Sequence, residues 1–469
     1  MSTITLPLWL VVLAGVLALI GLLDRLFVPS ARWFIRNRAN KVLDEVGSRL
    51  RIEIRPFQQT RRQVLIDRLL YDEKVQHAAA AFARDNKMPR EVVMAQLTGY
   101  AREIVPAFNA YFYFRVGYWL GRKIARLLYR VRVGYTDNDG LARVPASATV
   151  VFVMNHRSNM DYILAAYLVA DQAALSYAVG EWARIWPLQQ LIRSMGAYFV
   201  RRNSRNELYR KVIERYIVMA TEGGVTQAVY PEGGLTRDGK MRAPKLGVLD
   251  YMVRGFNPEG ERDLVFIPLG VNYDRTLEDR TLLLALDENK KKTGSLKAAW
   301  NTLAFCANQA MLMIRSEWHR FGYACVNFGT PVSMREFVRA RGIDFGKLPK
   351  EERYARIAEL GSLLMQSVGT LIPVLPVPLV ALVFERNPGR ALSELEIKSE
   401  VEVLIGRLET AGAHIYIPRR DRDYAITTGL RMMLLRHMVE ERDGLYATDP
   451  AEAVLVRYYA NSIAHLLQK

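Results

Sequence analysis

A histidine and an aspartate with catalytic potential directly follow an apolar run in the stretch VMNHRSNMDY, residues 153–162. The run ATVVFV at 148–153 has the length of a buried strand, so His156 is expected at the strand exit and Asp161 at the start of the next helix. Such a turn can fold the carboxylate back onto the imidazole, whereas one continuous helix would point the two side chains about 140° apart. A carboxylate on one ring nitrogen fixes the tautomer and leaves the other nitrogen free to act as a base. We therefore predict that His156 and Asp161 are catalytic. His156, oriented by Asp161, would remove a proton from an alcohol that attacks a carbonyl.

Taken alone, this spacing is a weak signal, and a capping aspartate beside a polar loop histidine would explain it better. Three further polar clusters change the balance, because each follows its own apolar strand pattern: GAYFVRR at 196–202, YPEGGLTRDGK at 230–240 and FIPLGVNYD at 266–274. Polar groups at the exits of strands are the usual material of sites in α/β domains. One arginine guanidinium group can bind two phosphate oxygens at once, and glycines let a ligand approach the backbone closely. Solvated or ion-paired surface arginines would explain one cluster, but not all three together.

In this order the clusters resemble the motifs of the glycerolipid acyltransferase superfamily with the HxxxxD motif, most closely the membrane-bound glycerol-3-phosphate acyltransferase family. The first motif matches NHRSNMDY at His156 and Asp161, and the second matches GAYFVRR at Arg201 and Arg202. The third matches YPEGGLTR, and the fourth matches FIPLGVNY at Ile267 and Pro268. The likeness is strong over about residues 150–275 and weaker through Lys245 and the helical tail.

The resemblance implies transfer of an acyl chain from an acyl thioester, acyl-CoA or acyl-ACP, to the sn-1 hydroxyl of glycerol 3-phosphate, giving lysophosphatidic acid. His156 would be the base, without a nucleophile role for Ser158 and without a metal or bound cofactor. The implied substrate-binding residues are Arg157, Ser158, Arg201, Arg202, Glu232, Gly233, Gly234, Arg237, Lys240 and Lys245. Leu235 stands where the family commonly has a further arginine, which leaves phosphate contact there to Arg237, helped by Lys240. Two alternatives stay open: a lysophospholipid or dihydroxyacetone-phosphate acyltransferase, and a catalytically dead membrane scaffold or lipid-binding protein.

The elements that must position these residues form an α/β pattern. Six short apolar runs of strand length alternate with helical patterns at 148–153, 175–180, 197–200, 226–230, 264–271 and 323–328. Strands apolar on both faces indicate a mixed, largely parallel sheet flanked by helices. We predict an acyltransferase domain over 140–345, between a helical N-terminal region at 42–139 and a C-terminal helical region at 346–469. Capping boxes are expected at Ser204 with Glu207 and at Ser393 with Glu396.

Composition narrows the class of partner. The chain has 469 residues and a net charge of +17, which implies an acidic partner such as a phosphorylated ligand, a carrier protein, an anionic membrane or nucleic acid. No nucleic-acid motif accompanies the charge, so nucleic acid is not expected as a partner. Only two cysteines are present, without CxxC spacing, which disfavours a disulfide framework or a thiolate zinc site.

Membrane attachment is predicted from an uncharged stretch, residues 6–23, whose eighteen residues approach the ~30 Å of a bilayer core. Basic residues follow it, so we expect a transmembrane anchor with a basic flank over 1–41, membrane lipids as partners, and a cell-membrane location with the catalytic domain on the cytoplasmic side. The aromatic and basic stretch from residue 108 suits either a bilayer interface or a core helix. The apolar stretch 368–384 holds three prolines and is expected to be buried or to dip into the membrane.

Overall fold

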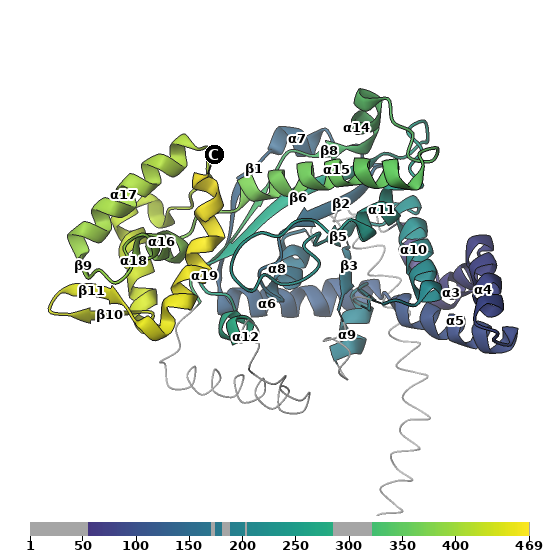
Figure 1. Cartoon of the computed structure of the whole chain (residues 1–469), viewed down its shortest axis with the longest axis horizontal. Helices are drawn as coiled ribbons and strands as arrows, with labels where there is room; N and C mark the ends of the chain where they lie inside the picture. The colour runs from purple at the N-terminus through teal and green to yellow at the C-terminus, as the bar shows by residue number, and fades with distance from the viewer. Residues whose placement is uncertain (1–54, 170–173, 181–187, 202–203, 285–320, 469) are drawn as a thin grey trace, which may run out of the picture.

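The structure is a computed structural model that describes residues 55–169, 174–180, 188–201, 204–284 and 321–468. Its centre is an eight-stranded sheet of order β1-β7-β6-β2-β5-β3-β4, with β8 paired to β6 (Figure 1). The five strands from β6 to β4 run parallel to one another, while β7 and β8 are antiparallel to β6. The predicted mixed, largely parallel sheet is therefore confirmed. The strands are β1 (Arg130–Thr136), β2 (Thr149–Met154), β3 (Ser176–Val179), β4 (Tyr198–Phe199), β5 (Gln227–Val229), β6 (Leu264–Tyr273), β7 (Tyr323–Phe328) and β8 (Val332–Ser333).

Helices cover both faces of this sheet because its central strands are apolar on both sides. In β2, Val151 and Val153 enter one core cluster, while Phe152 and Met154 enter another. Alternate residues of a strand point to opposite faces, which accounts for this division. The helices over the first face are α10 (Glu207–Glu222), α11 (Gly247–Val253), α14 (Met334–Arg341) and α15 (Lys350–Leu371), and those over the second are α6 (Tyr118–Leu128) and α8 (Met160–Val169) (Figure 1).

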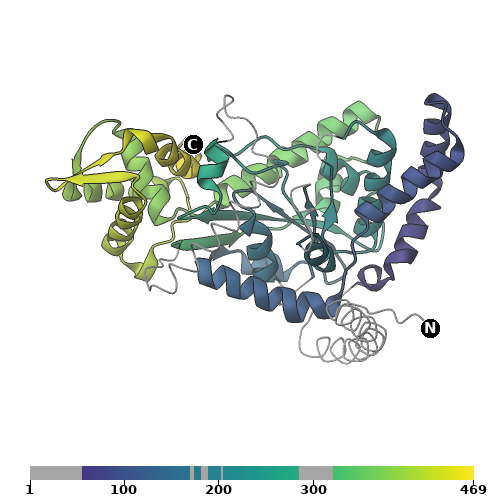
Figure 2. The ribbon, with the colours of Figure 1, turned by 90° about the horizontal axis from the view of Figure 1, so that it is seen from below.

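The N-terminal helices pack at one end of the sheet, where they share the first core cluster with α10 and α15. They are α2 (Pro56–Gln59), α3 (Arg62–Leu70), α4 (Glu73–Asp85) and α5 (Arg90–Ile104), and a π-helical turn, η1 (Phe112–Gly117), joins them to α6. A helical region was predicted here, although its boundary at residue 139 stays a prediction. Seen from below, these helices and the C-terminal region lie at opposite ends of the molecule (Figure 2).

The C-terminal region has a hydrophobic core of its own. It is formed by α16 (Pro376–Arg386), α17 (Glu394–Thr410), α18 (Arg422–Leu435) and α19 (Ala453–Ala464), with a small sheet of β9 (Leu392–Ser393), β10 (Val439–Arg442) and β11 (Leu445–Thr448) and the short 3₁₀ turns η3 (Pro418–Arg420), η4 (Pro450–Glu452) and η5 (His465–Leu467). The three prolines of the apolar stretch 368–384 fall between α15 and α16 and in the first turn of α16, where the lost amide donors are tolerated. Residues 376–384 are buried in this core, so the stretch is a buried element rather than one that dips into a membrane.

Three expectations need correction. Helix α10 is capped by Asn206, whose side chain accepts from the Tyr209 amide at 2.8 Å, and not by the predicted Ser204–Glu207 capping box. Strand β1 lies where a helical pattern was expected, because its alternating, mostly exposed residues pair with β7 along one edge only. Among the described residues, no helix combines the length and apolar character needed to cross a membrane. This finding contradicts the predicted cell-membrane location; the predicted span at residues 6–23 lies outside the described residues.

Candidate active site

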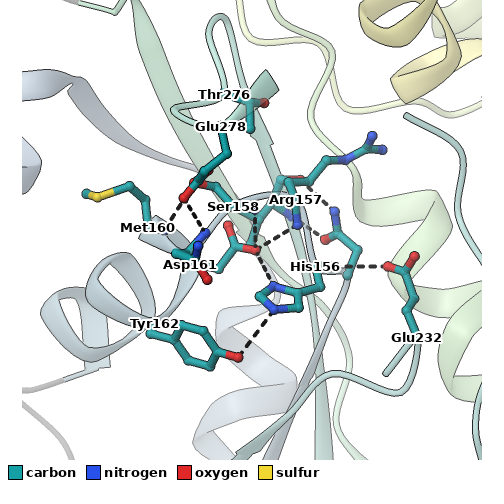
Figure 3. A network of polar contacts seen from close by, with 12 residues as sticks. His156, Arg157, Ser158, Met160, Asp161, Tyr162, Glu232, Thr276 and Glu278 are labelled. Atoms are coloured by element: carbon teal, nitrogen blue, oxygen red, sulfur yellow. Dashed lines mark hydrogen bonds and ion pairs between the residues drawn. The ribbon is translucent and has the colours of Figure 1, made fainter. Parts of the chain in front are cut away.

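The predicted histidine and aspartate meet at the exit of β2. The Asp161 carboxylate lies 2.9 Å from His156 Nδ1, and both side chains are buried (Figure 3). Because a carboxylate accepts, Nδ1 carries the ring hydrogen and Nε2 of the neutral ring is left as an acceptor. The Tyr162 hydroxyl lies 3.3 Å from this Nε2, in position to donate to it. The pair thus has the tautomer that a general base requires.

Asp161 is held by donors on both of its oxygens. Its Oδ2 accepts from the backbone amides of Arg157 at 2.7 Å and Ser158 at 3.0 Å, because the first turn of α8 folds the carboxylate back over the loop. Its Oδ1 accepts from the Tyr273 hydroxyl at 2.6 Å, at the end of β6. Burial, with the nearby Asp161 charge, raises the pKa of Tyr273 well above its usual value, so this phenol stays a donor. Charge-assisted bonds of this kind are the stronger ones, and they fix the carboxylate in one orientation.

The loop 230–242 holds the backbone of the histidine. Glu232 accepts from the His156 amide at 3.0 Å (Figure 3). It also accepts from the Arg242 amide at 3.1 Å, and the Thr236 amide donates to the His156 carbonyl at 3.1 Å. Burial raises the pKa of Glu232, opposed by these amides and by the Arg157 charge. On the other side, the side-chain amide of Asn155 exchanges two 2.8 Å bonds with the backbone of Val271 in β6. Contacts from β6 and from the loop after β5 therefore fix the position of the loop that carries His156.

A cavity opens beside the imidazole, and we call it the histidine cavity. Five residues predicted from the sequence line it, namely His156, Arg201, Gly233, Gly234 and Lys245, together with Tyr162, Tyr230 and apolar residues of β3, β5 and α11. Gly233 has a φ of +70°, and a Cβ there would lie 2.6 Å from Cδ of Lys245. Glycine at this position therefore lets the lysine stem cross the turn and bring its ammonium group to the cavity.

Arg201 enters the cavity wall already paired. Its Nε and Nη2 donate to the two carboxylate oxygens of Glu103 in α5, at 2.9 and 2.6 Å, and its guanidinium lies over the rings of Tyr100 and Tyr209. This pairing with Glu103 raises the pKa of Arg201. A phosphate would therefore contact Arg201 through Nη1 or displace the glutamate. Lys245, by contrast, is an exposed residue.

The other predicted residues lie outside the lining of this cavity. Arg157 is buried and donates to the carbonyls of Gly239 and Ser462, the latter at 3.1 Å. Ser158 donates to Glu278 at 2.7 Å, and burial raises the pKa of this glutamate. The remaining basic residues are exposed on the loop, namely Arg237 and Lys240, while Arg202 lies outside the described residues.

A second cavity, which we call the apolar cavity, adjoins the first. Its walls come from η1, α6, α8, β3 and α9 (Leu188–Ser194), and almost all of its lining is hydrophobic. Tyr162 and Val179 line both cavities. Gly121 of α6 lines it, and a Cβ there would approach Ile163 of α8 at 3.3 Å. The imidazole thus lies in the cavity that Arg201 and Lys245 also line, next to the Tyr162 side chain that this cavity shares with the apolar one.

Several site residues were not singled out from the sequence. Three of them are tyrosines inside the recognised motifs, namely Tyr162, Tyr230 and Tyr273. An aromatic residue in an apolar strand or helix pattern is predicted to be part of the hydrophobic core, so the pattern does not indicate a role for its hydroxyl. Asn155 adjoins the histidine directly, and its pairing with β6 depends on a strand neighbour that the sequence does not give. Among the described residues, no three side chains of His, Cys, Asp or Glu gather to hold a metal ion.

Comparison with known proteins finds two families and several relatives to which the chain is similar. A family described as "Acyltransferase" matches residues 137–272, and one described as "Glycerol-3-phosphate acyltransferase C-terminal region" matches residues 309–469. Proteins named glycerol-3-phosphate acyltransferase are similar over 86% of this chain, with 27% identity in Pseudomonas fluorescens (strain SBW25) and 25% in Xanthomonas axonopodis pv. citri (strain 306). These alignments cover 48% and 46% of the relatives, so the chain spans about half the length of the curated relatives it matches.

Among solved structures, the chain has a weak likeness to the crystal structure of the 1-acyl-sn-glycerophosphate (LPA) acyltransferase PlsC from Thermotoga maritima. The identity is 17% and the TM-score 0.31, over 54% of this chain and 78% of that one.

Proposed function

We propose that this chain transfers an acyl chain from an acyl thioester to the sn-1 hydroxyl of glycerol 3-phosphate, giving lysophosphatidic acid. The likeness to the acyltransferase and glycerol-3-phosphate acyltransferase families supports this proposal. The observation that carries the proposal is the His156–Asp161 pair, buried beside a cavity that also receives Lys245 and Arg201. A general base beside cations suits an acceptor that carries both a hydroxyl and a phosphate.

The acceptor hydroxyl takes the place now held by the Tyr162 hydroxyl, next to Nε2 of His156. Nε2 removes its proton as the oxygen attacks the thioester carbonyl carbon, and Asp161 stabilises the imidazolium that forms. When the carbonyl re-forms, the C–S bond breaks and the thiolate takes the proton from the imidazolium. The products are an ester and a free thiol, which is coenzyme A or the carrier protein. None of these steps uses a metal or a redox cofactor.

The apolar cavity receives the acyl chain in this proposal. Its position supports the assignment, because Tyr162 lines both cavities and stands at the imidazole. A hydrophobic chain lying between α6 and α8 would bring its thioester end to the junction, while the phosphorylated acceptor enters from the histidine cavity.

The proposal is tested by release of free thiol from acyl-CoA and acyl-ACP, with glycerol 3-phosphate, dihydroxyacetone phosphate or a lysophospholipid as the acceptor. Wild-type protein is expected to turn over fastest with glycerol 3-phosphate, and His156→Ala to lose about 10³-fold or more in kcat, as for removal of a catalytic base. Faster turnover with another acceptor would reassign the substrate. Unchanged turnover in His156→Ala would refute the mechanism.

Two lysines predicted from the sequence can be separated by the same assay. Lys245→Ala removes a cation at the histidine cavity and is expected to raise the KM for glycerol 3-phosphate about tenfold, since charged hydrogen bonds contribute about 1.5–3 kcal/mol. Lys240→Ala removes an exposed cation outside the lining of that cavity and is expected to change this KM less than twofold. The KM for the thioester should stay constant in both variants.

A further inference from the structure

The Tyr230 hydroxyl is a buried donor that the proposed mechanism has not used. This residue ends the run TQAVY, directly before the PEGG turn, and its side chain lines the histidine cavity. Its hydroxyl oxygen is buried and has no hydrogen-bond partner among the residues that the structure describes. Buried hydroxyls are normally paired, because leaving one unpaired costs free energy. A residue that lines the cavity and has a buried, unpaired hydroxyl is therefore a candidate donor for a group of the ligand.

The phenol lies close to the reacting groups. The ring of Tyr230 packs against the His156 imidazole, with centroids 4.3 Å apart and an angle of 33° between the planes. It also meets the Tyr162 ring edge to face at 4.9 Å. Tyr162 in turn stacks on Tyr177, which lines the apolar cavity. Tyr230 therefore stands at the junction where a thioester from one cavity and an alcohol from the other would meet.

The environment keeps this phenol protonated. Burial raises the pKa of Tyr230 well above its usual value, and the phenols of Tyr162 and Tyr177 and the Asp161 carboxylate add to the effect. A phenol that stays protonated is a hydrogen-bond donor. Its hydrogen bond stabilises most an acceptor oxygen that becomes negative during the reaction.

We propose that Tyr230 is a catalytic residue that donates a hydrogen bond to the carbonyl oxygen of the acyl thioester as this oxygen becomes an oxyanion. The inference rests on the proposed acyl transfer and names a donor for its transition state. As the acceptor oxygen bonds to the carbonyl carbon, the π electron pair moves to the carbonyl oxygen and is stabilised by the Tyr230 O–H. The pair returns when the C–S bond breaks, and Tyr230 keeps its proton throughout.

The test compares Tyr230→Phe with Tyr198→Phe in the full chain. Tyr198 is a matched control, because its hydroxyl is likewise buried without a partner among the described residues, but its ring packs in the hydrophobic core against Tyr216. We measure kcat, both KM values and the melting temperature, using acyl-CoA or acyl-ACP with glycerol 3-phosphate. Loss of a single oxyanion donor lowers kcat by about 10²–10³-fold in other enzymes.

Tyr230→Phe is expected to lower kcat by about 10²-fold with both KM values within about threefold and a melting temperature no lower than that of wild type. Tyr198→Phe is expected to keep the wild-type kcat. A wild-type kcat in Tyr230→Phe would overturn the inference while leaving the proposed function intact. A raised KM for glycerol 3-phosphate at unchanged kcat would also overturn it, because the phenol would then bind the phosphate. If the wild-type protein releases no thiol with any acceptor, the proposed function fails and the inference falls with it.

Discussion

At the scale of single residues, Asp161, which we propose to orient the general base, is fixed by a tyrosine from strand β6. The Tyr273 hydroxyl donates to the oxygen of Asp161 that does not face the histidine. Without this bond, the carboxylate is held on its Oδ2 side only, by the Arg157 and Ser158 amides, and it orients the imidazole less firmly. Tyr273 is thus a positioning residue, and it explains why the end of β6 belongs to the site.

Tyr273→Phe is expected to lower kcat about tenfold and to destabilise the protein by about 1.5–3 kcal/mol, the usual contribution of a hydrogen bond to a charged group. Tyr129→Phe is the control, because its hydroxyl donates at 2.8 Å to the Arg275 carbonyl and its ring lies 5.2 Å from that of Tyr273. The control should lose stability but keep its kcat. Denaturant unfolding and thiol release measure the two effects, and equal kcat losses in both variants would show that Tyr273 has no specific role.

The sequence reveals some of these residues and not others for a physical reason. His156 and Asp161 are polar residues that follow an apolar strand. Their residue types and their spacing therefore indicate a candidate active site. Tyr162, Tyr230 and Tyr273 combine a large apolar ring with one hydroxyl, and the ring alone explains their burial in a strand or helix. Their roles depend on where the hydroxyl points, which is decided by the pairing of β2, β5 and β6.

At the scale of elements, all six strands predicted from apolar runs are present, because burial on both faces leaves a strong pattern. Strand β1 was missed because its arginines alternate with apolar residues along an exposed edge. The small sheet of β9, β10 and β11 was also missed, since two- to four-residue strands give no periodic signal. The capping box of Ser393 and Glu396 is present as predicted at the start of α17.

The cap of α10 provides a test at this scale. Asn206→Ala is expected to lower the free energy of unfolding by about 1 kcal/mol, because the side chain satisfies the Tyr209 amide. Ser204→Ala, at the position favoured by the sequence pattern, is expected to change it by less than 0.5 kcal/mol, the usual range for surface substitutions. Urea denaturation of both variants measures the difference. A larger loss for Ser204→Ala would mean that the capping box predicted from the sequence is the one that forms.

The packing of α6 against α8 should limit the length of the acyl chain. Gly121→Leu places a side chain in the apolar cavity and displaces about two methylene groups of a long chain, at about 0.8 kcal/mol each. We expect kcat/KM to fall about tenfold for a palmitoyl thioester and less than twofold for an octanoyl thioester. Gly99→Leu is the control, since a Cβ at this α5 position meets nothing within 4 Å. Equal losses for the two chain lengths would place the acyl chain elsewhere.

At the scale of the whole molecule, the C-terminal region acts on the catalytic loop although its hydrophobic core is separate. The Asn461 side chain of α19 donates to the Asp238 carbonyl at 2.8 Å, and a Cβ at Gly239 would meet the Tyr458 carbonyl. Arg157, the residue after the catalytic histidine, bridges the carbonyls of Gly239 and Ser462. The position of the loop next to His156 therefore depends on the packing of α19 against it. This contact joins residues some 300 positions apart, so no local sequence pattern predicts it.

Arg157→Lys tests whether this arginine positions the loop or binds the phosphate, as the family resemblance implies. A lysine carries one nitrogen and cannot bridge both carbonyls, so a buried acceptor would lose its partner at a cost of about 1–3 kcal/mol. If Arg157 positions the loop, kcat should fall about tenfold, the melting temperature should fall, and the KM for glycerol 3-phosphate should stay within threefold. Asn461→Ala loosens the same docking without touching residue 157 and should produce a smaller loss of the same kind. A KM for glycerol 3-phosphate raised more than tenfold in Arg157→Lys alone would instead assign this guanidinium to the phosphate.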